Sequence, residues 1–156
     1  KMSTMNVKFA GLGGTGVVKA SDVFAELVFE LGYDVKKAEV HGMSQRGGSV
    51  ASDVRYGEKV ESPMIPDGEA QFLVVFAEDQ IPVNKAALKV GGTLLSPKDI
   101  DVSKLPSEKA LNVAMLGKLS TFFDFPLEKW EKILQKLFAP KFHEGNSIAF
   151  KIGREG

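Results

Sequence analysis

The order of apolar and polar residues near the N-terminus predicts a strand, a helix and a second strand. Residues 7–10 are a short, mainly apolar segment that leads directly into a glycine-rich loop. Between residues 17 and 31 the apolar positions recur mostly three or four apart, which is the spacing of one helix face. Gly32 then stands where a C-terminal cap belongs, and residues 33–40 follow as a strand. We therefore expect a βαβ unit.

The middle of the chain predicts two strands of different character. Residues 50–56 alternate between two kinds of side chain, as in a strand with unlike faces, and a turn after them would pair residues 59–61 with them as an antiparallel hairpin. Residues 72–76 are a continuous apolar run, typical of a central strand that is buried on both faces.

The C-terminal half predicts mainly helices. Helices are expected over residues 79–89, 110–123 and 126–138, and the polar, proline-bearing segment 97–109 is expected to be a loop. Short strands are expected over residues 93–95 and 148–152.

These elements together predict one α/β domain over residues 1–156, because no repeat, low-complexity tract or linker divides the chain. A chain of 156 residues is close to the commonest domain size of roughly 100–150 residues. We expect a three-layer αβα arrangement around a mostly parallel sheet that carries one antiparallel hairpin.

Composition and charge exclude several classes of protein. Twenty basic and twenty acidic residues give a formal net charge of zero, so no electrostatic footprint for nucleic acid or an anionic membrane is expected. The absence of cysteine excludes disulfides, a zinc–thiolate site, a cysteine nucleophile and a cysteine-ligated iron–sulfur cluster within these residues. No apolar run approaches the ~20 residues of a membrane span, and no signal peptide is recognised. We expect a cytoplasmic protein.

The first glycine-rich loop follows the first strand and precedes the first helix. Its spacing, with glycine at positions 11, 13 and 16, satisfies the dinucleotide fingerprint G-x-G-x-x-G. Glu39, near the end of the second strand, is the best candidate for the acidic residue that would hold a ribose. Two interpretations stay open, a ligand loop or a tight turn that lets helix and strand pack closely. The candidate residues are Gly11, Gly13, Gly14, Thr15 and Gly16.

The second glycine-rich loop combines a fixed cation with polar side chains. Arginine stays charged at any working pH and presents a planar fork of donors, which suits an anion or a carboxylate. The alternative is an ordered turn whose arginine meets a carboxylate of this chain or of a neighbouring subunit. His41, beside this loop, is either a hydrogen-bonded loop residue or a general base. The candidate residues are Gly42, Ser44, Gln45, Arg46, Gly47 and Gly48.

No convincing catalytic set accompanies the two loops. The sequence contains no Ser-His-Asp motif, P-loop lysine or zinc signature. We therefore predict neither a catalytic residue nor a metal ligand in this chain, and we expect the isolated chain to be inactive.

The two loops together resemble one family. The strings Phe9-Ala-Gly-Leu-Gly-Gly-Thr-Gly-Val-Val18 and Glu39-Val-His-Gly-Met-Ser-Gln-Arg-Gly-Gly-Ser-Val50 are similar to the gamma subunit or domain of 2-oxoacid:ferredoxin oxidoreductases. The second string is most similar to the beta subunit of indolepyruvate ferredoxin oxidoreductase. Residues 112–117 and 146–150 extend the resemblance, whereas the segment between residues 95 and 112 is shorter than is usual in the family.

This resemblance implies a function within a complex. The complex would oxidatively decarboxylate a 2-oxoacid of the indolepyruvate or pyruvate class, form an acyl-CoA and pass electrons to ferredoxin. Larger partner subunits would hold thiamine diphosphate and the iron–sulfur clusters, while coenzyme A binding and a homodimer are left open for this chain. Gly42, Ser44, Arg46, Gly47 and Gly48 match the family's loop. The alternative is a stand-alone nucleotide- or CoA-binding module that uses residues 11–16.

Overall fold

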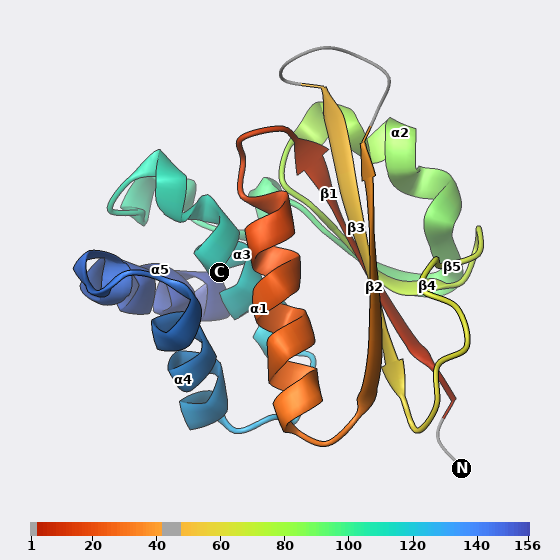
Figure 1. The fold of residues 1–156 in the computed structure, drawn as a ribbon. Helices are drawn as coiled ribbons and strands as arrows, with labels where there is room; N and C mark the ends of the chain where they lie inside the picture. The colour runs from red at the N-terminus through yellow and green to blue at the C-terminus, as the bar shows by residue number, and fades with distance from the viewer. Residues whose placement is uncertain (1–2, 42–47) are drawn as a thin grey trace.

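The protein is built around one mixed five-stranded sheet. The computed structural model describes residues 3–41 and 48–156, and its strands follow the order β2-β3-β1-β4-β5 across the sheet (Figure 1). The strands are β1 (Met5–Leu12), β2 (Asp34–His41), β3 (Ser49–Gly57), β4 (Ala70–Val75) and β5 (Leu88–Leu95). The expected strands at residues 7–10, 33–40, 50–56 and 72–76 are thus confirmed, and the first of them is longer than expected.

The pairing of the strands is less parallel than the sequence predicted. Strands β4 and β5 pair in parallel, as do β1 and β4, but β3 is antiparallel to both of its neighbours, β1 and β2. The antiparallel hairpin therefore joins β2 to β3, and the expected pairing of residues 59–61 with residues 50–56 was wrong. Because β3 is already paired along both edges, the segment after it has no edge to join. A side chain holds that segment instead, since the Val60 amide donates to Asp34 Oδ2 at 2.7 Å.

Helices cover the two faces of the sheet unequally. On one face α1 (Val17–Glu30) and α3 (Leu111–Ser120) lie against the strands, and α4 (Leu127–Leu137) and α5 (His143–Glu155) pack outside them (Figure 1). Among the described residues, the other face carries only α2 (Ile81–Asn84) and its flanking 3-10 turns, residues 78–80 and 85–87. The predicted three-layer αβα domain is present with a thin third layer. The helix expected over residues 79–89 is limited to these short turns, because β5 already begins at Leu88.

A cluster of aromatic rings joins the sheet to the helices. Phe24 of α1 is fully buried, and its ring centroid lies 5.4–6.1 Å from those of Phe9, Tyr56, Phe123 and Trp130. Rings at such distances add attraction to the stabilisation from apolar burial, which is roughly 1.5–3 kcal/mol for each large side chain. The apolar face of α1 is therefore fixed on the sheet, and with it the loop that precedes α1.

The C-terminal helix α5 replaces a strand that the sequence predicted at residues 148–152. Its buried residues are Asn146, Ala149, Phe150 and Gly153, which follow helical spacing rather than alternation. A Cβ atom on Gly153 would overlap the carbonyl oxygen of Ala114, and one on Gly117 would overlap that of Phe150. Helices α3 and α5 therefore pack backbone to backbone, a contact that only glycine permits.

The connection from β5 to α3 is a series of short turns. It contains 3-10 turns at Pro97–Asp99, Val102–Lys104 and Glu108–Ala110, each capped by a serine or aspartate side chain just before it. The loop expected over residues 97–109 is thus ordered by local hydrogen bonds. No helix within the described ranges is long and apolar enough to cross a membrane.

Candidate functional site

The first glycine-rich loop meets Gly48 and Ser49, the described end of the second, at the carboxyl end of β1. Leu12 at the end of β1 pairs with Ser49 at the start of β3, and one residue beyond this pair the Gly13 amide donates to the Gly48 carbonyl oxygen at 2.9 Å. The first loop, which joins β1 to α1, lies at the upper end of the sheet in Figure 1. The sheet register thus brings together what the sequence presented as two separate motifs.

The first loop has the shape of a tight turn. The backbone amide of Thr15 donates to the Leu12 carbonyl oxygen at 3.2 Å, and its hydroxyl donates to the same oxygen at 2.6 Å. A Cβ atom on Gly11 would lie 2.9 Å from Val17 Cγ2 and 3.1 Å from Phe76 Cβ. Close packing of strand against helix therefore requires glycine at position 11 whether or not a ligand binds.

Gly16 ends the loop and is covered by a side chain from the start of α3. Gly16 has a φ of 81°, in the left-handed region, and a Cβ atom there would lie 2.5 Å from Asn112 Nδ2. Asn112 Nδ2 donates to the Gly16 carbonyl oxygen at 3.4 Å, and Asn112 Oδ1 accepts from the Val113 amide at 2.9 Å. Sequence reasoning had noted residue 112 only as part of a family string, because nothing local links it to Gly16.

The open side of the first loop borders a pocket of about 560 Å³. Gly14, Thr15 and Gly16 form one wall, and Glu108, Lys109 and Leu111 form the other. Gly13 and Gly14 are exposed, and a Cβ atom on Gly14 would meet nothing within 4 Å. The start of α1 favours an anion at this pocket, while Lys109 and Glu108 contribute one charge of each sign.

A buried glutamine, which sequence reasoning missed, supports the second loop. Ser49 Oγ donates to Gln80 Oε1 at 2.7 Å, and Asn84 Nδ2 donates to the Gln80 carbonyl oxygen at 2.8 Å. Gln80 is only 7% exposed. The turn after β4 thereby anchors the first residue of β3, and no pattern near Gln80 in the sequence could have indicated this.

The position of the loops matches the place where α/β sheets bind ligands. The connection after β1 passes over one face of the sheet through α1, and the connection after β4 passes over the other face through α2 (Figure 1). Neighbouring parallel strands whose connections diverge leave a crevice at their carboxyl ends. The glycine loop 13–16 and residues 77–80 border this point.

Five of the predicted site residues lie outside the described residues: Gly42, Ser44, Gln45, Arg46 and Gly47. For His41 the structure describes the backbone, which pairs with Val50 in the β2–β3 ladder. Gly48 is described and forms the contact with Gly13 reported above. The roles expected for the second loop stay predictions.

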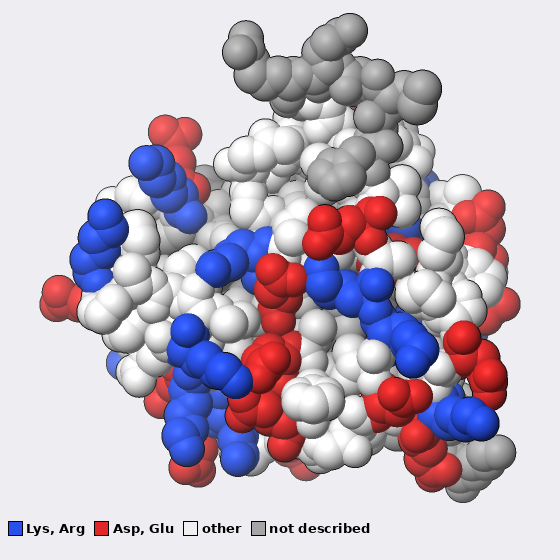
Figure 2. Space-filling view, in the orientation of Figure 1, with Lys and Arg blue, Asp and Glu red and all other residues white. Residues whose placement is uncertain are grey.

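Glu39 does not occupy the place that the dinucleotide fingerprint requires. That fingerprint places the ribose-binding acid on the strand next to the glycine loop's own strand, but β3 lies between β2 and β1. Glu39 Oε2 instead accepts from Lys37 Nζ at 2.8 Å, and Lys37 also pairs with Asp22 of α1 at 3.0 Å. Acidic and basic side chains are interspersed over this face in Figure 2. The expectation that Glu39 holds a ribose is therefore not supported by the topology.

Comparisons with known proteins agree with the resemblance carried by the two loops. The sequence model of the pyruvate ferredoxin/flavodoxin oxidoreductase family matches residues 6–110. Indolepyruvate oxidoreductase subunit IorB of Thermococcus kodakarensis is 30% identical, and that of Pyrococcus horikoshii is 36% identical. Each alignment covers 97% of this chain and 95% of the relative. Both span 192 positions, more than the 156 residues here, so the relatives carry residues without a counterpart in this chain.

Solved structures share the fold at low sequence identity. The gamma subunit of a keto/oxoacid ferredoxin oxidoreductase from Geobacter sulfurreducens superposes with a TM-score of 0.80 at 23% identity, over 99% of this chain and 96% of that one. A 2-oxoglutarate:ferredoxin oxidoreductase from Magnetococcus marinus gives 0.79 at 18% identity, over 99% of this chain but 31% of the other. The same fold is thus a whole subunit in one protein and part of a longer chain in another. With its matched family model, its end-to-end relatives and its joined glycine loops, the chain belongs to the pyruvate ferredoxin/flavodoxin oxidoreductase family.

Proposed function

We propose that this chain is the small, gamma-type accessory subunit of a 2-oxoacid:ferredoxin oxidoreductase. The complex oxidatively decarboxylates a 2-oxoacid of the indolepyruvate or pyruvate class, forms an acyl-CoA and delivers electrons to ferredoxin. One observation carries the proposal. A hydrogen bond from Gly13 to Gly48 links the two motifs of the family resemblance, in a chain that aligns end to end with subunits of such enzymes.

The chemistry of the chain supports an accessory role. Iron–sulfur clusters in proteins are held mainly by cysteine thiolates, and these 156 residues contain no cysteine. The described residues also hold no group of three or more histidine, aspartate or glutamate side chains that could bind a metal ion. The residues present therefore do not fit a cluster, and we place the clusters and thiamine diphosphate in larger partner subunits. The joined loops would border the partner's active-site region.

Purification of the tagged chain from its own cells tests this function. We expect a larger, cysteine-rich subunit to copurify, and the complex to reduce ferredoxin when a 2-oxoacid and coenzyme A are supplied. The chain alone should reduce none, and the partner without the chain should lose activity that adding the chain restores. Recovery of the chain at native levels without such a partner would contradict the proposal.

A second candidate function is a stand-alone nucleotide- or CoA-binding module. The open pocket beside Gly14–Gly16 and Lys109 favours it, whereas the position of Glu39 does not. Calorimetry of the purified chain with NAD, ADP and coenzyme A tests it, and replacing Gly13 with valine should weaken any binding at the loop. Absence of heat with all three ligands would reject this candidate and leave the first unaffected.

A further inference from the structure

A second pocket, separate from the glycine loops, lies in the helical layer. It has a volume of about 320 Å³, and its described lining residues are Pro106, Ser107, Lys109, Ala110, Phe138, Lys141, Phe142, Gly145 and Asn146. Binding pockets for small molecules typically have volumes of about 300–1,000 Å³ and mainly apolar walls with a few polar groups. Here Pro106, Ala110, Phe138 and Phe142 provide the apolar wall.

The charged side chains that line this pocket are cationic. They are Lys109 and Lys141, and none of the described lining residues is acidic, although Glu108 and Glu144 lie next to lining residues in the sequence. Lys141 Nζ lies 5.2 Å from the centroid of the Phe142 ring, and Lys19 Nζ lies 4.9 Å from that of Phe138. None of these three lysines forms a salt bridge with an acidic side chain in the described part of the chain. Their charge is therefore available to an incoming anion.

The first turn of α5 adds hydrogen-bond donors. Asn146 lines the pocket and is 7% exposed, yet its Nδ2 has no hydrogen-bond partner among the described residues. A buried donor without a partner is unusual in folded proteins and calls for a specific explanation. The amide groups at the start of this 13-residue helix also carry partial positive charge.

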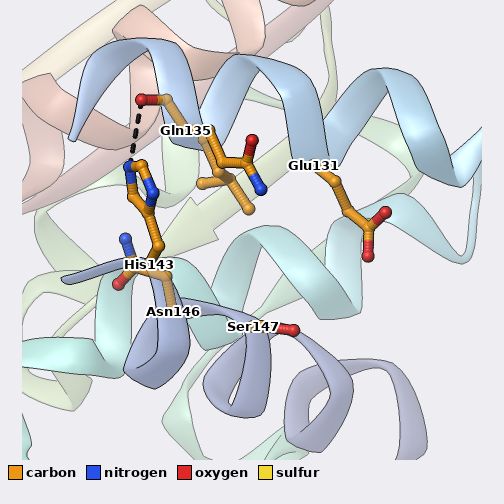
Figure 3. A pocket seen from close by; sticks show the side chains of 6 residues that line it. Glu131, Gln135, His143, Asn146 and Ser147 are labelled. Carbon is orange, nitrogen blue, oxygen red and sulfur yellow. Dashed lines mark hydrogen bonds between the residues drawn. The ribbon is translucent and has the colours of Figure 1, made fainter. Parts of the chain in front are cut away.

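His143 holds the start of α5 in place beside the pocket. Its Nε2 lies 2.9 Å from the Phe138 carbonyl oxygen and 3.1 Å from that of Gln135, at the end of α4. Figure 3 draws the Gln135 contact in a neighbouring pocket, which Asn146 also lines together with Glu131 and Ser147. In that view the Asn146 amide lies on the same side of α5 as the His143 ring, away from Glu131 and Ser147. The aromatic wall and the donor are thus positioned by one contact between helices.

We propose that this pocket binds a small organic anion. The apolar body of this anion lies between Pro106, Phe138 and Phe142, and the anionic group faces Lys109, Lys141 and the Asn146 amide. None of its described lining residues belongs to a glycine loop, and it adjoins the pocket of the first loop through Lys109, which lines both. The proposal concerns a ligand of this chain itself and does not depend on the function proposed for the complex.

Calorimetric titration of the purified full chain tests the pocket with three probes: 3-phenylpropanoate, its uncharged amide, and inorganic phosphate. We expect saturable binding of the acid at least about tenfold tighter than of the amide, because a charge-assisted contact of about 1.4 kcal/mol changes affinity tenfold. Phosphate, which has no apolar body, should bind more weakly than the acid.

Two variants locate the site, and a third is the matched control. Lys141→Met removes an exposed charge and should weaken binding of the acid about tenfold. Gly145→Leu should block the pocket while leaving the helix intact, since a Cβ atom there meets only Pro106 Cγ, at 4.0 Å. Lys89→Met removes an equally exposed charge on β5 and should leave binding unchanged.

Several results would overturn the proposal. If the acid binds wild type and Gly145→Leu equally, lysines at the surface attract it without the pocket. If acid and amide bind equally, or neither binds, the site is not an anion site. If no probe binds but Gly145→Leu blocks assembly with a larger subunit, the pocket is a subunit contact and not a ligand site. Circular dichroism checks that each variant is folded. If Gly145→Leu does not fold, the test rests on Lys141→Met, and unchanged binding of the acid to that variant would overturn the proposal.

Discussion

Asn112 of α3 lies directly against Gly16 at the end of the first glycine loop, with its Nδ2 3.4 Å from the Gly16 carbonyl oxygen. This contact spans 96 residues of sequence. It couples the shape of the loop to the helical layer, so a change in the packing of α3 is transmitted to the surface where the two loops meet.

The contact predicts that replacing Gly16 lowers the free energy of unfolding more than replacing the nearby Gly14. Gly16→Ala and Gly14→Ala both place a side chain at a positive φ, at a cost of roughly 1–2 kcal/mol. Only Gly16→Ala also meets Asn112, which should remove about 1–3 kcal/mol more from the free energy of unfolding. Urea unfolding of the two variants measures the difference. Equal losses would show that Asn112 does not confine Gly16.

Close packing of α3 and α5 predicts that one methyl group added at position 153 strongly destabilises the fold. Gly153→Ala places its Cβ against the Ala114 carbonyl oxygen, so the helices must separate, and we expect a loss of about 3 kcal/mol or more. Gly145→Ala on the same helix is the control. It has free space and should be neutral or stabilising by up to about 1 kcal/mol. A small loss for Gly153→Ala in thermal unfolding would contradict the backbone contact.

The ion pair between the half-buried Lys8 and the buried Asp53 should contribute more to stability than an exposed pair does. Asp53 is 1% exposed, and its carboxylate accepts from Lys8 Nζ at 2.7 Å and from the Ile65 amide at 2.9 Å. Asp53→Asn leaves the lysine without its counter-charge and should cost about 3 kcal/mol. The exposed pair Lys59–Glu61 is the control, and Glu61→Gln should change stability by less than about 1 kcal/mol. Similar losses of unfolding free energy for Asp53→Asn and Glu61→Gln in chemical unfolding would show that the Lys8–Asp53 pair contributes no more than the exposed pair.

The buried tyrosine of the aromatic cluster predicts weakening in alkali. Burial raises the pKa of Tyr56 well above its ordinary value, and the neighbouring Tyr33 raises it further. The unfolded chain ionises near pH 10. The stabilising contribution is therefore complete below about pH 10 and is lost as the pH rises from there towards the folded pKa. Unfolding free energies measured across this range should fall faster for wild type than for Tyr56→Phe. Parallel curves would show that Tyr56 ionises freely in the folded state.

Arg46 predicts a functional effect that rests on its chemistry alone, because it lies outside the described residues. Lysine cannot reproduce the two parallel hydrogen bonds of a guanidinium. Arg46→Lys should therefore weaken assembly or turnover of the complex by roughly tenfold, while thermal unfolding of the chain itself stays unchanged. Assembly and ferredoxin reduction at wild-type levels would exclude an anion or carboxylate partner for Arg46.

Local patterns predicted the elements better than they predicted how those elements pair. The ends of α1, α3 and α4 lie within a few residues of the expected ones, because helical spacing of apolar residues is a local property. The strand predicted for the C-terminal segment was wrong for the same reason, because that prediction also used only local spacing. Residues 148–152 contain apolar residues at alternate positions, and only contact with α3 selects the helical face that includes Gly153.

The candidate site shows the same division. Both glycine loops were evident in the sequence, and so was the family that they indicate, since these features depend on residue type and spacing. The structure added what lies opposite each loop: Asn112 against Gly16, Gln80 beneath Ser49, and the Gly13–Gly48 hydrogen bond. These partners come from different elements, so no window of sequence contains them together.

By itself, the sequence determined the α/β class, the two loops and the family, because each of these depends on the local spacing or the identity of residues. Tertiary structure alone decided that β3 lies between β2 and β1, that Gly13 bonds to Gly48, and that an apolar pocket with two lysines adjoins the pocket of the first loop. The physical reason is that strand order and the packing of helices depend on which distant surfaces bury each other. That choice is made by the whole chain at once.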